Sequence, residues 1–194
     1  MEHGCCKFNR YKPMKKHITA LILCFLIFAI SSVTANAKPR LDVVKHGGFT
    51  ELSDEDMQDT IQTLTDKIVK DCGVTRAKTV SCYDWEQSPV LAYNLIYCDI
   101  ICVNFSGFRT TADADAVGET VEYHLVKTLA HEVRHSYQYE HRLDGTDYGN
   151  ACLLGFQTYE EYNGDRALYY QQFIEADAEA WAIDYANKYF NLVR

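Results

Sequence analysis

One segment near position 130 most constrains what this chain can fold into. Residues 128–142 have the sequence TLAHEVRHSYQYEHR. Apolar side chains recur every four residues and predict a helix from about Val121 to about Arg142; they are Val121, Leu125, Leu129 and Val133. Residues four apart lie on one face of a helix, so His131 and His135 can direct both imidazoles at one ion. The segment therefore predicts two ligands of a metal site.

Glu132 follows the first of these histidines directly. It lies about 100° further round the helix, which places its carboxylate beside the ion rather than on it. From there it can take a proton from a water that the metal holds. Zinc prefers four tetrahedral donors, and a catalytic site leaves one of the four positions to water. A third protein ligand is therefore required.

A second helix, predicted over about 167–189, offers that ligand. Its segment FIEADAEAWA places acids among small residues, and a buried carboxylate needs a partner such as a metal ion. Glu175 follows His135 by 40 residues. Glu179 shares its face and is placed to accept the outward N–H of a ligand histidine. Glu179 and Asp177 remain alternatives to Glu175 as the third ligand.

The combination of these two motifs resembles a known family. His131-Glu132-x-x-His135 followed by Glu175-x-x-Ala178-x-x-Trp181-Ala182 is similar to the gluzincin metallopeptidases, above all to small single-domain members such as the minigluzincins and the ImmA/IrrE-type peptidase domain. The resemblance covers roughly 100–182. It implies that His131, His135 and Glu175 bind one zinc ion and that Glu132 is the general base.

The resemblance also implies a substrate-binding strand and has departures. In that family the sheet before the zinc helix ends in an edge strand that holds the substrate backbone, which Ile100–Phe105 would match. Trp181 stands where phenylalanine is usual, and Glu179 stands where larger members have an aspartate. The metzincin pattern H-E-x-x-H-x-x-G-x-x-H is not matched in full, because Gln138 stands at the position of its glycine, although His141 stands at that of its third histidine.

The rest of the chain predicts a small α+β domain. Ser53 and the acids after it begin a helix that ends near Gly73. β-branched and aromatic residues over 77–85 and 88–108 predict a small antiparallel sheet with Ile100–Phe105 as its last strand, and glycines mark 145–164 as a loop. We expect a zincin-like fold with an N-terminal helix, a short, mostly antiparallel sheet, the H-E-x-x-H helix and a C-terminal ligand helix.

The first residues are typical of a secretory signal. A basic start precedes an apolar run of 13 residues, Ile18–Ile30, and Ala35-Asn36-Ala37 matches an A-x-A cleavage site. A membrane-spanning helix needs roughly 20 apolar residues. We expect a signal peptide over 1–37, a secreted domain over 38–194, and membrane attachment only if the signal stays uncleaved as an anchor.

Net charge narrows the class of possible partners, and the cysteine content sets how many disulfides can form. Residues 38–194 carry 14 Lys and Arg against 26 Asp and Glu, a net charge of −12. This balance excludes nucleic acid as a partner, since affinity there depends on neutralising phosphates, and favours a peptide or protein substrate. A secreted domain meets an oxidising environment, so we expect up to two disulfides and one free thiol among its five cysteines, which are Cys72, Cys82, Cys98, Cys102 and Cys152.

The sequence therefore predicts a secreted zinc metallopeptidase that hydrolyses peptide bonds through a metal-activated water. Two alternatives remain: a catalytically silent metal-binding protein of the same fold, or a zinc amidase that acts on cell-wall peptides. We expect His124 and His141 to be structural or solvated and Arg134 to be exposed or paired with an acid. The candidate donors to a developing oxyanion are Tyr159, Tyr162, Tyr169 and Tyr170.

Overall fold

A computed structural model describes residues 41–85, 90–109, 114–115, 117–158, 168 and 171–192. The chain divides into two units, 1–38 and 39–194, and the described residues all lie in the second. The predicted signal peptide lies outside the described residues. Among those that are described, no helix combines the length and hydrophobicity needed to cross a membrane.

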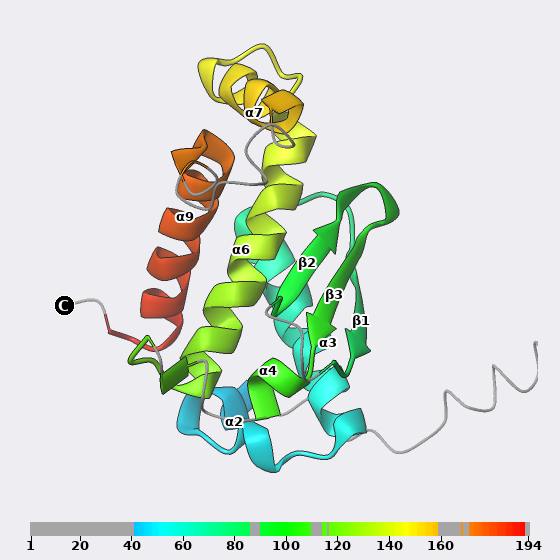
Figure 1. The fold of residues 1–194 in the computed structure, drawn as a ribbon, viewed down its shortest axis with the longest axis vertical. Coiled ribbons are helices and arrows are strands. Elements are labelled where there is room, and N and C mark those ends of the chain that lie inside the picture. Colours follow the sequence, from blue (N-terminus) through cyan, green and yellow to red (C-terminus); the bar gives the residue numbers. More distant parts are fainter. Residues whose placement is uncertain are drawn as a thin grey trace, which may run out of the picture. The chain divides into compact units, whose positions relative to one another are not determined.

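The domain is α+β, as predicted. In chain order its elements are α2 (Leu41–His46), η1 (Phe49–Glu51), α3 (Asp54–Cys72), β1 (Thr79–Tyr83), β2 (Ala92–Leu95), η2 (Ile96–Cys98), β3 (Ile100–Asn104), α4 (Ser106–Arg109), α6 (Val121–His141), α7 (Asp147–Thr158) and α9 (Phe173–Tyr189). Helix α6 lies between α9 and the sheet (Figure 1). It also packs against α3, so one helix contacts every layer of the domain.

Helix α3 forms where its sequence predicts. The Ser53 hydroxyl accepts a hydrogen bond from the backbone N–H of Asp56, and Gly73 ends the helix in a left-handed conformation with φ of 80°. The apolar face between these caps is buried against the core. Burial of that face holds α3 against α6 and β1.

The sheet differs from the prediction in strand order and direction. The order is β1-β3-β2, with β1 parallel and β2 antiparallel to β3, so the sheet is mixed. β3 is therefore the central strand, and the expected edge position of Ile100–Phe105 is wrong. Its near-continuous apolar sequence fits a strand that is buried on both faces. The edge strand beside α6 is β2.

Residues 147–158 form helix α7, although the glycines of 145–164 predicted a loop. The Thr146 hydroxyl accepts a hydrogen bond of 2.9 Å from the backbone N–H of Gly149 at the start of α7. Gly155 allows α7 to approach α9 closely, because a Cβ there would lie 2.7 Å from Cγ2 of Ile174. This glycine serves packing rather than a turn, and for that reason the loop prediction was wrong over 147–158; residues 159–164 of the predicted loop lie outside the described residues.

The C-terminal helix is confirmed over Phe173–Tyr189; of the earlier residues predicted for it, only 168, 171 and 172 are described. Ala178, Ala182 and Ala186 are fully buried. These small side chains allow α9 to lie close along α6, with which it makes its main contacts. The approach brings the acids of α9 to the histidines of α6.

The predicted disulfides are absent, since all five described cysteines are free thiols. Cys82 and Cys102 lie on neighbouring strands, but Cys82 pairs with Val103 and Cys102 with Ser81. Their positions are one residue out of register, so their side chains point to opposite faces of the sheet. Burial raises the pKa of the Cys82 thiol to about 12.

Candidate metal centre

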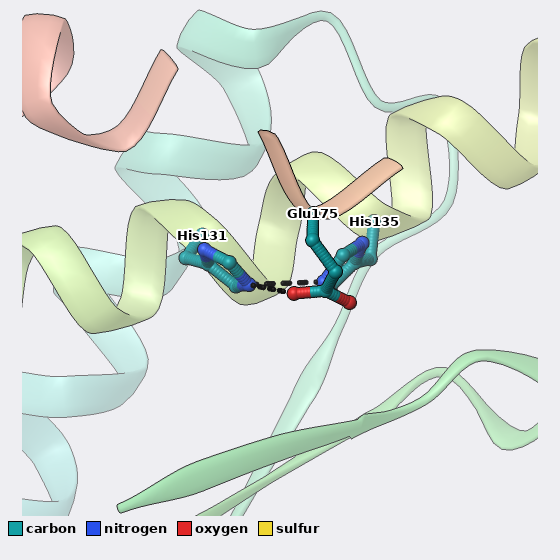
Figure 2. Close-up of side chains that lie close together, drawn as sticks. All are labelled: His131, His135 and Glu175. Atoms are coloured by element: carbon teal, nitrogen blue, oxygen red, sulfur yellow. Dashed lines mark hydrogen bonds and ion pairs between the residues drawn. The ribbon is translucent and has the colours of Figure 1, made fainter. Parts of the chain in front are cut away.

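The three predicted ligands converge at the interface of α6 and α9. Helix α6 begins at its N-cap Thr120 and presents His131 and His135 one turn apart, and Glu175 lies in the first turn of α9. Figure 2 shows the two imidazoles and the carboxylate directed at one point. The two Nε2 atoms are 3.0 Å apart, the Glu175 carboxylate lies 3.2 Å from Nε2 of His131, and its other oxygen lies 3.4 Å from Nε2 of His135.

Such a group could hold a metal ion. One ligand atom from each of the three residues lies within 4.8 Å of the other two. The Glu175 side chain is only 1% exposed, so its charge is removed from water and requires close partners. Of the three acids that the sequence offered on α9, Glu175 is the one directed at both histidines.

Glu179 lies behind His131. Its Oε2 is 3.4 Å from Nδ1 of His131, the ring nitrogen that does not face Glu175. Burial lowers the pKa of His131, but the hydrogen bonds to Glu175 and Glu179 outweigh it and raise that pKa to about 10. The hydrogen bond between His131 and Glu179 also lowers the pKa of Glu179. Glu179 thus occupies the supporting position that the sequence suggested for it.

Gln138 supports the second histidine and was missed from the sequence. Its Oε1 lies 2.8 Å from Nδ1 of His135. Its amide nitrogen donates to the backbone carbonyl of Ile174 at 2.7 Å and to Asp177 at 2.8 Å. The side chain is fully buried. Its position three residues after His135, on the same helix face, is the signal that points to it.

Asp177 has a structural role rather than a ligand role. Arg134 donates to its carboxylate from Nε at 2.8 Å and from a second nitrogen at 3.1 Å, and the Tyr148 hydroxyl donates at 2.9 Å. Burial raises the pKa of Asp177, but the hydrogen bonds from Arg134 and Gln138 outweigh it and lower that pKa. Arg134 is thus mostly buried and paired with an acid, which was one of its two expected states.

The candidate general base lies beside this group and beneath the edge strand. Burial raises the pKa of Glu132, and His135 and His131 partly offset that effect. The Asn94 side chain on β2 donates to the Glu132 backbone carbonyl at 2.6 Å and to the Ser136 hydroxyl at 2.7 Å. These two bonds fix β2 against the turn of α6 that carries His131 and His135.

Two cavities open on either side of Glu132. A cavity of about 580 Å³ lies on the His135 side, and one of about 840 Å³ lies on the side of His131 and Glu175. Val90, Ala92 and Glu132 line both of them. We refer to the two cavities together as the cleft, since they share these three residues and β2 contributes to both.

The other candidates of the sequence lie apart from the metal group. His124 contacts Glu119 through Nδ1 at 2.7 Å, and His141 contacts Asp144 at 3.3 Å. The tyrosines considered as oxyanion donors lie outside the described residues; these are Tyr159, Tyr162, Tyr169 and Tyr170.

Comparison with protein-family models, with characterised proteins and with solved structures found no match to this chain.

Proposed function

We propose that this protein is a zinc-dependent metallopeptidase that cleaves extended polypeptides. The observation that carries the proposal is the spacing of the three donors. Tetrahedral ligands at the bond lengths of zinc, about 2.0–2.1 Å, lie about 3.3 Å from one another. Within the group the two Nε2 atoms are 3.0 Å apart, one oxygen of Glu175 lies 3.2 Å from Nε2 of His131 and its other oxygen lies 3.4 Å from Nε2 of His135, so each pair of side chains approaches at about this separation.

The residues around the group suit hydrolysis. Zinc, when bound, supplies a Lewis acid that polarises a peptide carbonyl and activates water. Glu132 lines both halves of the cleft. From this position its carboxylate can take a proton from the attacking water and pass it to the leaving amine. Gln138 and Glu179 hold the outward nitrogens of the two histidines, which orients the rings.

The edge strand suits an extended substrate. The backbone carbonyl of Leu91 accepts a hydrogen bond from Asn104 on β3. In an antiparallel pair such bonds alternate along the strand, so the backbone groups of Ala92 and Asn94 point to the open edge. An extended peptide can pair with these groups as an added strand. Its carbonyls would then pass along the cleft beside the metal group.

Metal analysis combined with peptide cleavage tests the proposal. We expect about one zinc ion per chain in wild type and in Glu132→Gln, and loss of the metal in Glu175→Ala. Wild type should cleave a library that contains protein-derived and cell-wall peptides, and Glu132→Gln should not. Wild type that cannot be loaded with zinc refutes the metal site. A zinc-loaded wild type that cleaves nothing would instead indicate a silent metal-binding protein, and cleavage confined to cell-wall peptides would indicate the amidase.

A further inference from the structure

Asp177 is the centre of a hydrogen-bond network behind the metal group. Its carboxylate accepts four hydrogen bonds from described residues, two from Arg134, one from Gln138 and one from the Tyr148 hydroxyl, over distances of 2.8–3.1 Å. Arg134 and Gln138 lie on α6 and Tyr148 lies on α7, whereas Asp177 lies on α9. One carboxylate therefore joins three helices.

Aromatic rings hold the Arg134 side of this network. The guanidinium lies 4.5 Å from the ring centroid of Tyr137, 5.4 Å from that of Tyr148 and 5.8 Å from that of Trp181. Cation–π attraction to these rings adds to the two charge-assisted hydrogen bonds that Arg134 donates to Asp177. The arginine and its rings thus hold the carboxylate in one position.

The other side of the network reaches the metal group through Gln138. The amide nitrogen of Gln138 donates to Asp177 at 2.8 Å and to the backbone carbonyl of Ile174 at 2.7 Å. A carboxylate and a carbonyl only accept, so the amide oxygen must face the opposite way, toward His135. This oxygen lies 2.8 Å from Nδ1 of His135 and also only accepts, so Nδ1 carries a hydrogen. The other ring nitrogen, Nε2, is then the one that faces Glu175, at 3.4 Å.

We propose that Asp177 is a positioning residue of the metal centre that acts on His135 through Gln138. The inference rests on the metal site of the proposed function and adds a residue that lies one step further from the ion than the direct partners of the histidines. Asp177 holds one amide hydrogen of Gln138, and the carbonyl of Ile174 holds the other. Without Asp177 the amide keeps one of these two bonds, so the His135 ring is held less firmly in the orientation that the ion requires.

The zinc affinity of matched variants tests the inference. Asp177→Asn keeps the size of the side chain and should weaken zinc binding about 3–10-fold, as measured by competition with a chromogenic chelator. Tyr148→Phe removes one donor to the carboxylate without a change of charge and should weaken zinc binding about 2-fold. Tyr185→Phe is the control and should leave the affinity unchanged, since the Tyr185 hydroxyl donates to a different carboxylate, that of Asp71, at 2.8 Å and does not line the cleft.

A double-mutant cycle tests whether Asp177 acts through Gln138. In the Gln138→Leu background, Asp177→Asn should lose most of its effect on zinc affinity, because the link to His135 is already broken. An equal loss of affinity in both backgrounds would overturn the inference and would assign the effect to the charge of Asp177 or to the stability of the fold.

Proton NMR of the metal-free protein separates failure of this inference from failure of the proposed function. The Nδ1–H of His135 should give a downfield signal in wild type and in Tyr185→Phe, because Gln138 shelters it from exchange with water, and a broadened or missing signal in Asp177→Asn. An unchanged signal in Asp177→Asn would refute the positioning role whether or not the protein binds zinc. The expected signals in a protein that cannot be loaded with zinc would support the positioning role and refute the metallopeptidase. Melting curves confirm that each variant folds, and Tyr148→Phe carries the same comparisons if Asp177→Asn does not.

Discussion

Gln138 offers the sharpest test of how the metal centre is held. Gln138→Leu removes the acceptor at Nδ1 of His135 and the donor to the carbonyl of Ile174, bonds of 2.8 and 2.7 Å. Loss of such a supporting contact weakens metal binding about 10–100-fold, or about 1.4–2.7 kcal/mol. Loss of the two buried hydrogen bonds that the amide donates, to the Ile174 carbonyl and to Asp177, costs a further ~1–3 kcal/mol of folding free energy in the metal-free protein.

The two effects are measured separately. Competition with a chromogenic chelator gives the zinc affinity, and urea denaturation of the metal-free protein gives the free energy of unfolding. Gln138→Glu should retain most of the zinc affinity, because it keeps an acceptor at His135. It should still lose stability, because it places a second carboxylate where an amide now donates to Asp177.

Gln62 is the matched control for this experiment. It also bridges two elements, since it accepts from the backbone N–H of Val80 at 2.8 Å and donates to the carbonyl of Lys78 at 2.9 Å. Gln62→Leu should therefore destabilise the fold without a change in zinc affinity. Gln138→Leu that binds zinc as tightly as wild type would refute the supporting role, as would an equal loss of affinity in Gln62→Leu.

Three further predictions concern the scaffold. Ser53→Ala should lower the free energy of unfolding by about 1 kcal/mol through loss of the α3 cap, as measured by urea denaturation. Gly155→Ala should cost about 1–3 kcal/mol, because its Cβ would lie 2.7 Å from Ile174, and a smaller residue at position 174 should recover part of this loss. In native protein at pH 8, mass spectrometry should find the exposed Cys98 alkylated quickly. The Cys82 thiol should react slowly, because burial raises its pKa to about 12. Equal alkylation rates at the two cysteines would contradict the burial of Cys82.

Helices α3, α6 and α9 could be predicted because their signals are local. Ser53 and Gly73 mark the two ends of α3 within one turn of the residues that they cap. Strand order carries no such signal. Thr79 pairs with Ile100 across 21 positions, and the sequence between them does not record whether the strands run parallel. The apolar run of β3 was the available indication of a central strand. Gly155 was wrongly interpreted as a loop residue for a related reason, since Ile174, the neighbour that requires a glycine there, is distant in sequence.

The grouping of His131, His135 and Glu175 could be predicted because it follows from two helical repeats that meet. On α6, Lys127, His131 and His135 are spaced by four residues, and on α9 so are Glu175 and Glu179. The two helices run antiparallel (Figure 1). Their side chains interleave, as the distances between these residues show. Glu175 lies 3.4 Å from His135 and 3.2 Å from His131, and Glu179 lies 3.4 Å from His131 and 4.0 Å from Lys127.

This interleaving also decides which acid faces both histidines. A residue two positions after Glu175 lies about 200° round the helix, so Asp177 cannot face the same histidines. Glu175 lies between two imidazoles and is 1% exposed, whereas Glu179 lies between an imidazole and an ammonium group and is 47% exposed. The spacing of these residues within each helix can be read directly from the sequence. The register between the helices is set by packing, through buried alanines such as Ala178 and Ala182, and that register places Glu175 between the two histidines.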